Sequence, residues 1–149
     1  MAGNQDSVEI AIQRIYIKDL SFESPGAPDI FKSQFQPKIQ IDIETSNKEL
    51  QSGLFEVSLT ITATANTETK TIFIAEIEQA GIFAIKGAST ETLKQILHIY
   101  CPTALFPYAR ETIDSMTTKG SLPPLMLAPI NFEGLYHQQE KEEEEEEEK

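Results

Sequence analysis

The chain has 149 residues, 40% of them hydrophobic, and a formal net charge of −12. A chain of this size forms one domain with a sizeable core, and no apolar run approaches the ~20 residues of a transmembrane helix. The acidic balance disfavours nucleic acid, which is bound through basic side chains, and favours a basic protein partner. The single cysteine, Cys101, excludes an intrachain disulfide and is expected to be a buried thiol in a reducing compartment.

Both ends of the chain are expected to be disordered. Residues 1–7 are polar and lack the basic and apolar regions of a signal peptide, so we expect the protein to stay in the cytoplasm. Residues 137–149 contain an unbroken run of glutamates at 142–148, whose mutual repulsion opposes a compact state. The tail is expected to aid solubility, with recruitment of basic partners as an alternative. The folded domain is thus predicted to span residues 8–136.

The first half of the chain predicts β-strands. Apolar and polar residues alternate from Val8, and the alternation continues with a phase change through Ile15, Ile17 and Leu20 to Phe22, which is typical of a β-bulge. Prolines within 24–28 end this strand. Further alternating segments lie at 39–44, 54–65 and 70–77, with a hairpin turn at 66–69. Because the connections are short, we expect a four-stranded antiparallel sheet.

The second half changes to helical periodicity. Ser89 can cap a helix that Pro102 is expected to interrupt, and helix is predicted to resume near Pro107 and to stop at Gly120. A short last helix is expected from Asn131 to about residue 136. The buried stripe of the resumed helix is predicted to comprise Tyr108, Ala109, Thr112, Ile113 and Met116. The predicted class is therefore α+β, a sheet packed with a long interrupted helix and a short C-terminal helix.

The sequence contains none of the common catalytic or metal-binding motifs. It has no Gly-rich phosphate loop, no GxSxG elbow, and no His or Cys pair at metal spacing. His98 and His137 are isolated along the chain. We therefore predict a protein without catalytic residues, metal or cofactor; a small oligomeric enzyme that uses His98 or Cys101 is the alternative.

Two strands place acidic residues at alternate positions. Asp19 and Glu23 share one side of an extended segment, whereas Leu20 and Phe22 are expected to point to the core. In the fourth strand one face carries Ile74, Glu76 and Glu78. Such a surface is either a solvated strand face or a docking patch, in which charge orients a partner and an apolar contact adds affinity.

The remaining hydrophobic surface suggests self-association and a groove. The fourth strand is apolar on both faces, but a single helical layer can cover only one, so we expect a closed symmetric oligomer. The apolar segment 121–129 cannot form regular helix, because it contains three prolines. Together with Phe31 and Phe35 it either lines a groove or forms a packed connection.

Six collinear segments resemble the SecB family over about residues 8–136. They are 12–16 (IQRIY), 18–23 (KDLSFE), 79–83 (QAGIF), 100–102 (YCP), 105–111 (LFPYARE) and 127–132 (LAPINF). Ala80 stands where the family commonly has glycine, Phe35 stands where tryptophan is frequent, and the polyglutamate tail is not a fixed family feature.

The resemblance implies a four-stranded sheet backed by helices and assembled as a tetramer, a dimer of dimers. It also implies ATP-independent binding of unfolded preproteins and their delivery to the SecA motor, whose zinc-bearing C-terminal segment docks on the sheet. The implied SecA-binding residues are Asp19, Glu23, Ile74 and Glu76. The implied client-binding groove is lined by Phe31, Phe35, Ile39, Ile41, Leu125, Leu127, Leu135 and Tyr136. An antitoxin-associated interaction module that shares this fold remains an alternative.

Overall fold

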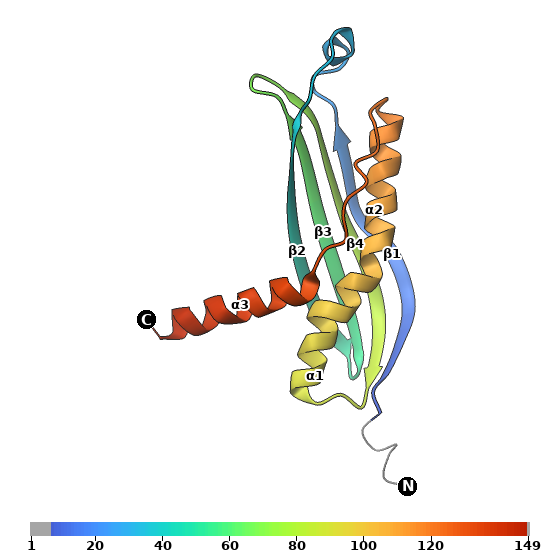
Figure 1. Ribbon diagram of the computed structural model, residues 1–149. Helices are drawn as coiled ribbons and strands as arrows, with labels where there is room; N and C mark the ends of the chain where they lie inside the picture. The colour runs from blue at the N-terminus through green and yellow to red at the C-terminus, as the bar shows by residue number, and fades with distance from the viewer. Residues whose placement is uncertain (1–6, 149) are drawn as a thin grey trace.

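A computed structural model describes residues 7–148 (Figure 1). The described chain forms one four-stranded antiparallel sheet in the order β1-β4-β3-β2, with helices on one of its faces. The strands are β1 Glu9–Glu23, β2 Lys38–Gln51, β3 Leu54–Asn66 and β4 Thr71–Lys86. The predicted α+β class and the four-stranded antiparallel sheet are confirmed. Residues 1–6 of the segment expected to be disordered lie outside the described residues.

The change of phase predicted in the first strand is a real irregularity of β1. The register of β1 against β4 shifts between Ile12 and Arg14, and again between Ile17 and Asp19. Strands β2 and β4 extend well beyond their predicted ends. The polar extension of β2 forms because backbone hydrogen bonds to the neighbouring strand do not require an apolar pattern. The extension of β4 is largely apolar, and its Phe83 and Ile85 are buried in the core.

Alternation along β3 separates the sheet into two faces. Val57, Leu59 and Ile61 have no exposed surface and form the main core with Leu105 and Ile113 of the helical layer. The intervening side chains point to the opposite face, on which no helix of the described chain lies (Figure 1). We call this second surface the open face.

The helical layer is continuous, contrary to the predicted interruption. Helix α1 (Thr90–Gln95) passes through a π-helical segment (Ile96–Tyr100) into α2 (Cys101–Lys119). The altered hydrogen bonding of the π-helical segment accommodates Pro102 in the first turn of α2. The predicted cap is confirmed, because Ser89 Oγ accepts a hydrogen bond from the Thr92 amide at 3.2 Å.

The buried stripe of α2 differs in part from the predicted one. Ala109 and Ile113 are fully buried as expected, but the side chain of Tyr108 is 50% exposed. The stripe instead continues to Leu105 and Thr117, which lie three or four residues from Ala109 and Ile113 and face the sheet with them. Tyr108 is therefore a surface residue beside β1.

The last helix, α3 (Phe132–Glu147), is much longer than predicted. The sequence predicted a short helix followed by a disordered tail from residue 137, whereas in the structure the helix continues through the glutamate run. Asn131 caps it, and only Phe132 and Tyr136 are buried. The high helix propensity of glutamate extends the helix beyond its last packed residue. No helix within residues 7–148 is long and apolar enough to cross a membrane.

Candidate functional site

The residues predicted to dock a partner lie together on the open face, on β1 and β4. In the ladder of these strands Asp19 is opposite Glu78, and Glu23 is opposite Ile74. Glu76 lies between these two pairs on β4. Directly opposed residues have Cβ atoms about 4.5–5.5 Å apart, so the side chains form one contiguous surface. We call Asp19, Glu23, Ile74, Glu76 and Glu78 the acidic patch.

The negative charge of the acidic patch is not neutralised within the described chain. None of its four carboxylates forms an ion pair with another described residue. Glu76 accepts a hydrogen bond from the Thr62 hydroxyl at 3.2 Å. Asp42 and Glu44 of β2, two alternate carboxylates of the kind that are usually solvated, lie on the same face two strands away. Acidic residues of the open face therefore occur on β2 as well as on β1 and β4.

The predicted orientation of Leu20 and Phe22 is correct, but their predicted burial is only partly so. Both lie opposite core residues of β4. Phe22 stacks on Phe73 with the ring centroids 5.8 Å apart, whereas the side chain of Leu20 remains 42% exposed. Leu20 lies on the edge strand β1.

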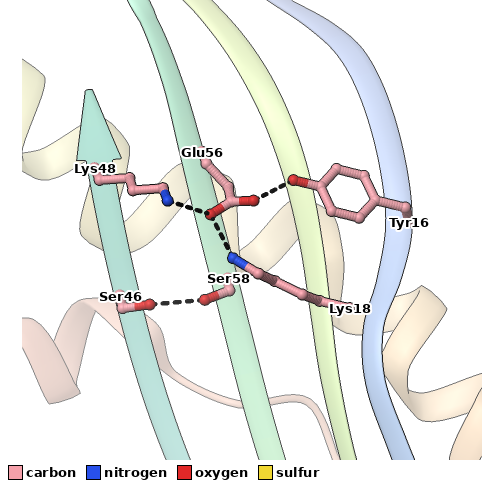
Figure 2. A network of polar contacts seen from close by, with 6 residues as sticks. All are labelled: Tyr16, Lys18, Ser46, Lys48, Glu56 and Ser58. Carbon is pink, nitrogen blue, oxygen red and sulfur yellow. Dashed lines mark hydrogen bonds and ion pairs between the residues drawn. The ribbon is translucent and has the colours of Figure 1, made fainter. Parts of the chain in front are cut away.

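A polar cluster centred on Glu56 lies on the same open face, and Figure 2 shows its contacts. The hydroxyl of Tyr16 donates a hydrogen bond to Glu56, and Lys18 Nζ lies 2.8 Å from its Oε1. Lys48 Nζ lies 3.9 Å from the same oxygen. These contacts link β1 and β2 to β3, with the Tyr16 and Lys18 side chains spanning β4. We call Tyr16, Lys18, Lys48 and Glu56 the Glu56 cluster.

The contacts within the Glu56 cluster shift its ionisation. The hydrogen bond from Lys18, followed by that from Tyr16, lowers the pKa of Glu56. Burial, followed by the hydrogen bond to Glu56, raises the pKa of Tyr16 to about 12. Near neutral pH the cluster thus holds an ionised carboxylate, a neutral phenol and two ammonium groups. Sequence reasoning missed this cluster, because only the strand register brings position 56 near positions 16 and 18.

Three of the predicted groove residues line two adjoining pockets. Phe31 and Phe35 line a pocket of about 620 Å³ together with the Ser121–Pro123 part of the α2–α3 connection. Phe35 also lines a second pocket, of about 800 Å³, with Ile39 and the β3–β4 hairpin. Phe31 is 51% exposed and Ile39 is 42% exposed. We call these two pockets the apolar groove.

The other predicted groove residues lie elsewhere. Ile41, Leu125 and Leu127 pack partly buried against the core. Tyr136 is buried and stacks on His98 with the ring centroids 5.0 Å apart, and Leu135 lies beside it in α3, 40% exposed. Among the polar residues missed in the sequence are Lys38 and Asn66, which the β2–β3 register places opposite one another at the second pocket.

The residues of the enzymatic alternative are embedded in the helical layer. Cys101 has no exposed surface, and burial raises the pKa of its thiol to about 12. The buried thiol predicted from the sequence is therefore confirmed. His98 Nδ1 lies 2.8 Å from the Lys94 carbonyl oxygen. No group of three or more His, Cys, Asp or Glu side chains within residues 7–148 is arranged to hold a metal ion.

A further pocket, of about 440 Å³, lies between β1 and α2. It is lined by apolar and polar side chains that include Ile17, Tyr108 and Gln79. The Gln79 side chain is 3% exposed and donates a hydrogen bond to the Tyr16 carbonyl oxygen at 3.1 Å, but its Oε1 has no partner within the described chain. A buried amide oxygen without a donor is costly, and nothing in the sequence indicated it.

The described chain thus combines a four-stranded sheet, one helical face, an open face with an acidic patch, and an apolar groove. The profile of the family described as "Preprotein translocase subunit SecB" matches residues 3–143. A protein-export protein SecB from Chromohalobacter salexigens is 49% identical over 91% of this chain and 84% of its own. Another, from Hahella chejuensis, is 52% identical over 85% of this chain and 79% of its own.

The fold matches a solved structure as well. A SecB-like chaperone from Mycobacterium tuberculosis, in complex with a peptide from the HigA1 antitoxin, superposes with a TM-score of 0.68. The match covers 81% of this chain and 90% of that one, at 21% identity. The chain belongs to the SecB family of protein-export chaperones, which confirms the resemblance found in the sequence.

The shifted pKa of Tyr16 can be tested by alkaline titration. Its folded value of about 12 lies above the ordinary 10.0, so its contribution to stability is present below pH 10.0 and is lost as the pH rises toward 12. Burial also raises the pKa of Tyr136, so we expect phenolate absorbance to show more than one late tyrosine. Tyr16→Phe should remove one late transition, and Glu56→Gln should shift that transition to lower pH. Tyr108→Phe, at an exposed position, should leave the late transitions in place.

Proposed function

We propose that this chain is an ATP-independent chaperone that binds unfolded preproteins, keeps them competent for translocation and delivers them to the SecA motor. The observation that carries the proposal is the apolar groove. Phe31 and Ile39 expose large apolar side chains in adjoining pockets, whereas the surrounding rim is polar. Exposed apolar surface of this kind is typical of a site for another chain.

Holding a client requires several weak contacts. Burial of one client Leu or Phe side chain contributes roughly 1.5–3 kcal/mol, whereas association costs about 4–15 kcal/mol. One anchor is therefore insufficient. Several grooves on one oligomer that engage the same unfolded chain raise the avidity without sequence-specific contacts. A folded client offers no extended apolar segment, so slow-folding preproteins are bound preferentially.

Ile41, Leu125, Leu127, Leu135 and Tyr136 remain proposed groove residues.

We propose the acidic patch as the SecA-binding site. Its free carboxylates complement a basic segment, and Ile74 supplies the apolar contact in their midst. The resemblance to the SecB family indicates the zinc-bearing C-terminal segment of the motor as the ligand. The zinc belongs to that partner. The motor and the groove then compete for one client, and handover follows docking.

We propose that the functional form is a homotetramer, a dimer of dimers. Strand β1 is an edge strand, and Ile12 and Ile17 on it are 45% and 48% exposed. Tyr108 beside it is 50% exposed, and the unpaired Gln79 oxygen lies in the pocket between them. Pairing of two β1 edges and packing of the outer surfaces of α2 would cover these groups.

The remaining parts of the proposal follow from the same features. We infer that the protein acts in the cytoplasm, has no catalytic activity, does not bind nucleic acid and does not insert into membranes. The high pKa of the buried Cys101 thiol disfavours a thiolate nucleophile. An antitoxin-associated module with one dedicated partner is the second candidate, since the fold neighbour is in complex with an antitoxin peptide. Broad client binding would argue against it.

The holding activity can be tested with a denatured, slow-folding preprotein diluted into this protein without nucleotide. We expect a bound, refolding-arrested complex at about one client per oligomer. Phe31→Asp should shorten the arrest several-fold, because it puts a charge into the groove, whereas Leu50→Asp, at an exposed position on the far edge strand, should not. Refolding at the unassisted rate would contradict the proposal and favour the dedicated-partner module.

Docking of the motor can be tested with Glu76→Lys. Reversal of one charge in the middle of the acidic patch should weaken binding of purified SecA at least tenfold and make the loss of binding with salt shallower, because less charge attraction is left to screen. Client arrest should be unchanged, because the groove lies elsewhere. Glu49→Lys, on the opposite face of β2, serves as the matched control. Equal binding by wild type and Glu76→Lys would exclude the acidic patch as the docking site.

The oligomer can be tested by sedimentation equilibrium. The wild type should show a mass about four times the 16.7 kDa of the chain. Tyr108→Asp should shift the equilibrium toward smaller species, because it places a charge within an apolar interface. Leu50→Asp should leave the mass unchanged. A tetramer that survives Tyr108→Asp would place the interface away from this side of α2.

A further inference from the structure

Lys18 lies at the boundary between the acidic patch and the Glu56 cluster. It occupies the register shift of β1 between Ile17 and Asp19, so it is the additional residue of a bulge. Bulges redirect side chains, and this one brings a lysine onto the open face directly beside Asp19. A basic residue here is unexpected in a surface that docks a basic partner.

Two acidic groups compete for the Lys18 ammonium. Glu56 of β3 binds it at 2.8 Å (Figure 2). Glu78 of the acidic patch lies on the other side, opposite Asp19 in the ladder. The hydrogen bond to Glu56 raises the pKa of Lys18, and the charge of Glu78 adds a smaller effect in the same direction. Lys18 is thus within electrostatic range of both.

The geometry favours Glu56 because this carboxylate is already held in place. Its side chain is only 14% exposed, and the Tyr16 hydroxyl and Lys48 ammonium contact it from the two edge strands. Lys18 is more exposed, at 41%. A fixed acceptor with additional hydrogen bonds loses less conformational entropy on pairing than an exposed carboxylate does.

We propose that Glu56 is a positioning residue for partner docking, which holds Lys18 away from Asp19 and Glu78 and so preserves the negative charge of the acidic patch. This inference rests on the docking function proposed above. The occupant of the patch is a protein segment with basic side chains. Lys18 would otherwise compete with this segment for the carboxylates of Asp19 and Glu78. Glu56 itself does not contact that segment.

The test is a double-mutant cycle on residues 18 and 56, with purified SecA as the probe. Glu56→Gln keeps the size of the side chain and its capacity to accept from Tyr16, so the fold is expected to persist. It should weaken docking roughly two- to fivefold, in line with exposed ion pairs. Lys18→Gln should not weaken docking, and Glu56→Gln combined with Lys18→Gln should restore wild-type affinity.

Controls separate positioning from changes in total charge or in structure. Glu49→Gln removes one charge from the opposite face and should have no effect on docking. Unchanged docking by Glu56→Gln would overturn the inference. So would a double variant that binds as weakly as Glu56→Gln alone, because the loss would then arise from altered strand geometry rather than from the freed lysine.

A crystal structure of Glu56→Gln gives a readout that does not depend on any partner. Lys18 Nζ should move toward Asp19 or Glu78, and an ammonium that stays beside residue 56 would overturn the inference. If the wild type and every variant fail to bind SecA, the proposed docking function fails. The position of Lys18 in the crystal structure of Glu56→Gln still decides whether Glu56 holds Lys18.

Discussion

The alternation of side chains along β3 and β4 is the constraint on which the rest of this protein depends. In both central strands every second residue is buried, and Leu59 and Ile77 have no exposed surface. The residues between them are thereby directed to the open face, whether or not they are apolar. One strand pair thus supplies a core and a polar surface, and α2 can cover only one of them.

The two edge strands, β1 and β2, carry residues of the two proposed binding sites. The bulge of β1 at Lys18 places an extra side chain on the open face, between the acidic patch and Glu56. At the opposite edge, β2 starts beside the β3–β4 hairpin, where Phe35 and Ile39 line the apolar groove. The proposed docking site and the proposed client groove therefore lie on different parts of one small sheet, an arrangement in which a partner and a client could be bound together.

Local patterns were sufficient for the elements that depend on local physics. The alternation of the strands, the Ser89 cap and the bulge in β1 were all predicted, because period and capping are properties of neighbouring residues. The continuity of the helix through Pro102 and the helical tail were not predicted. The first depends on a π-helical segment, and the second on intrinsic helix propensity that outweighs the repulsion between glutamates.

The sequence by itself determined the α+β class, the acidic character of the surface and the alternate spacing of Asp19, Glu23, Ile74 and Glu76. It also carried the collinear segments that identify the SecB family. Only the tertiary structure decided which residues meet across strands. The contact of Tyr16 and Lys18 with Glu56, the buried oxygen of Gln79 and the meeting of Phe31 with Ser121–Pro123 all join residues far apart in the chain. Strand register and loop packing set such contacts, and neither is encoded in a local pattern.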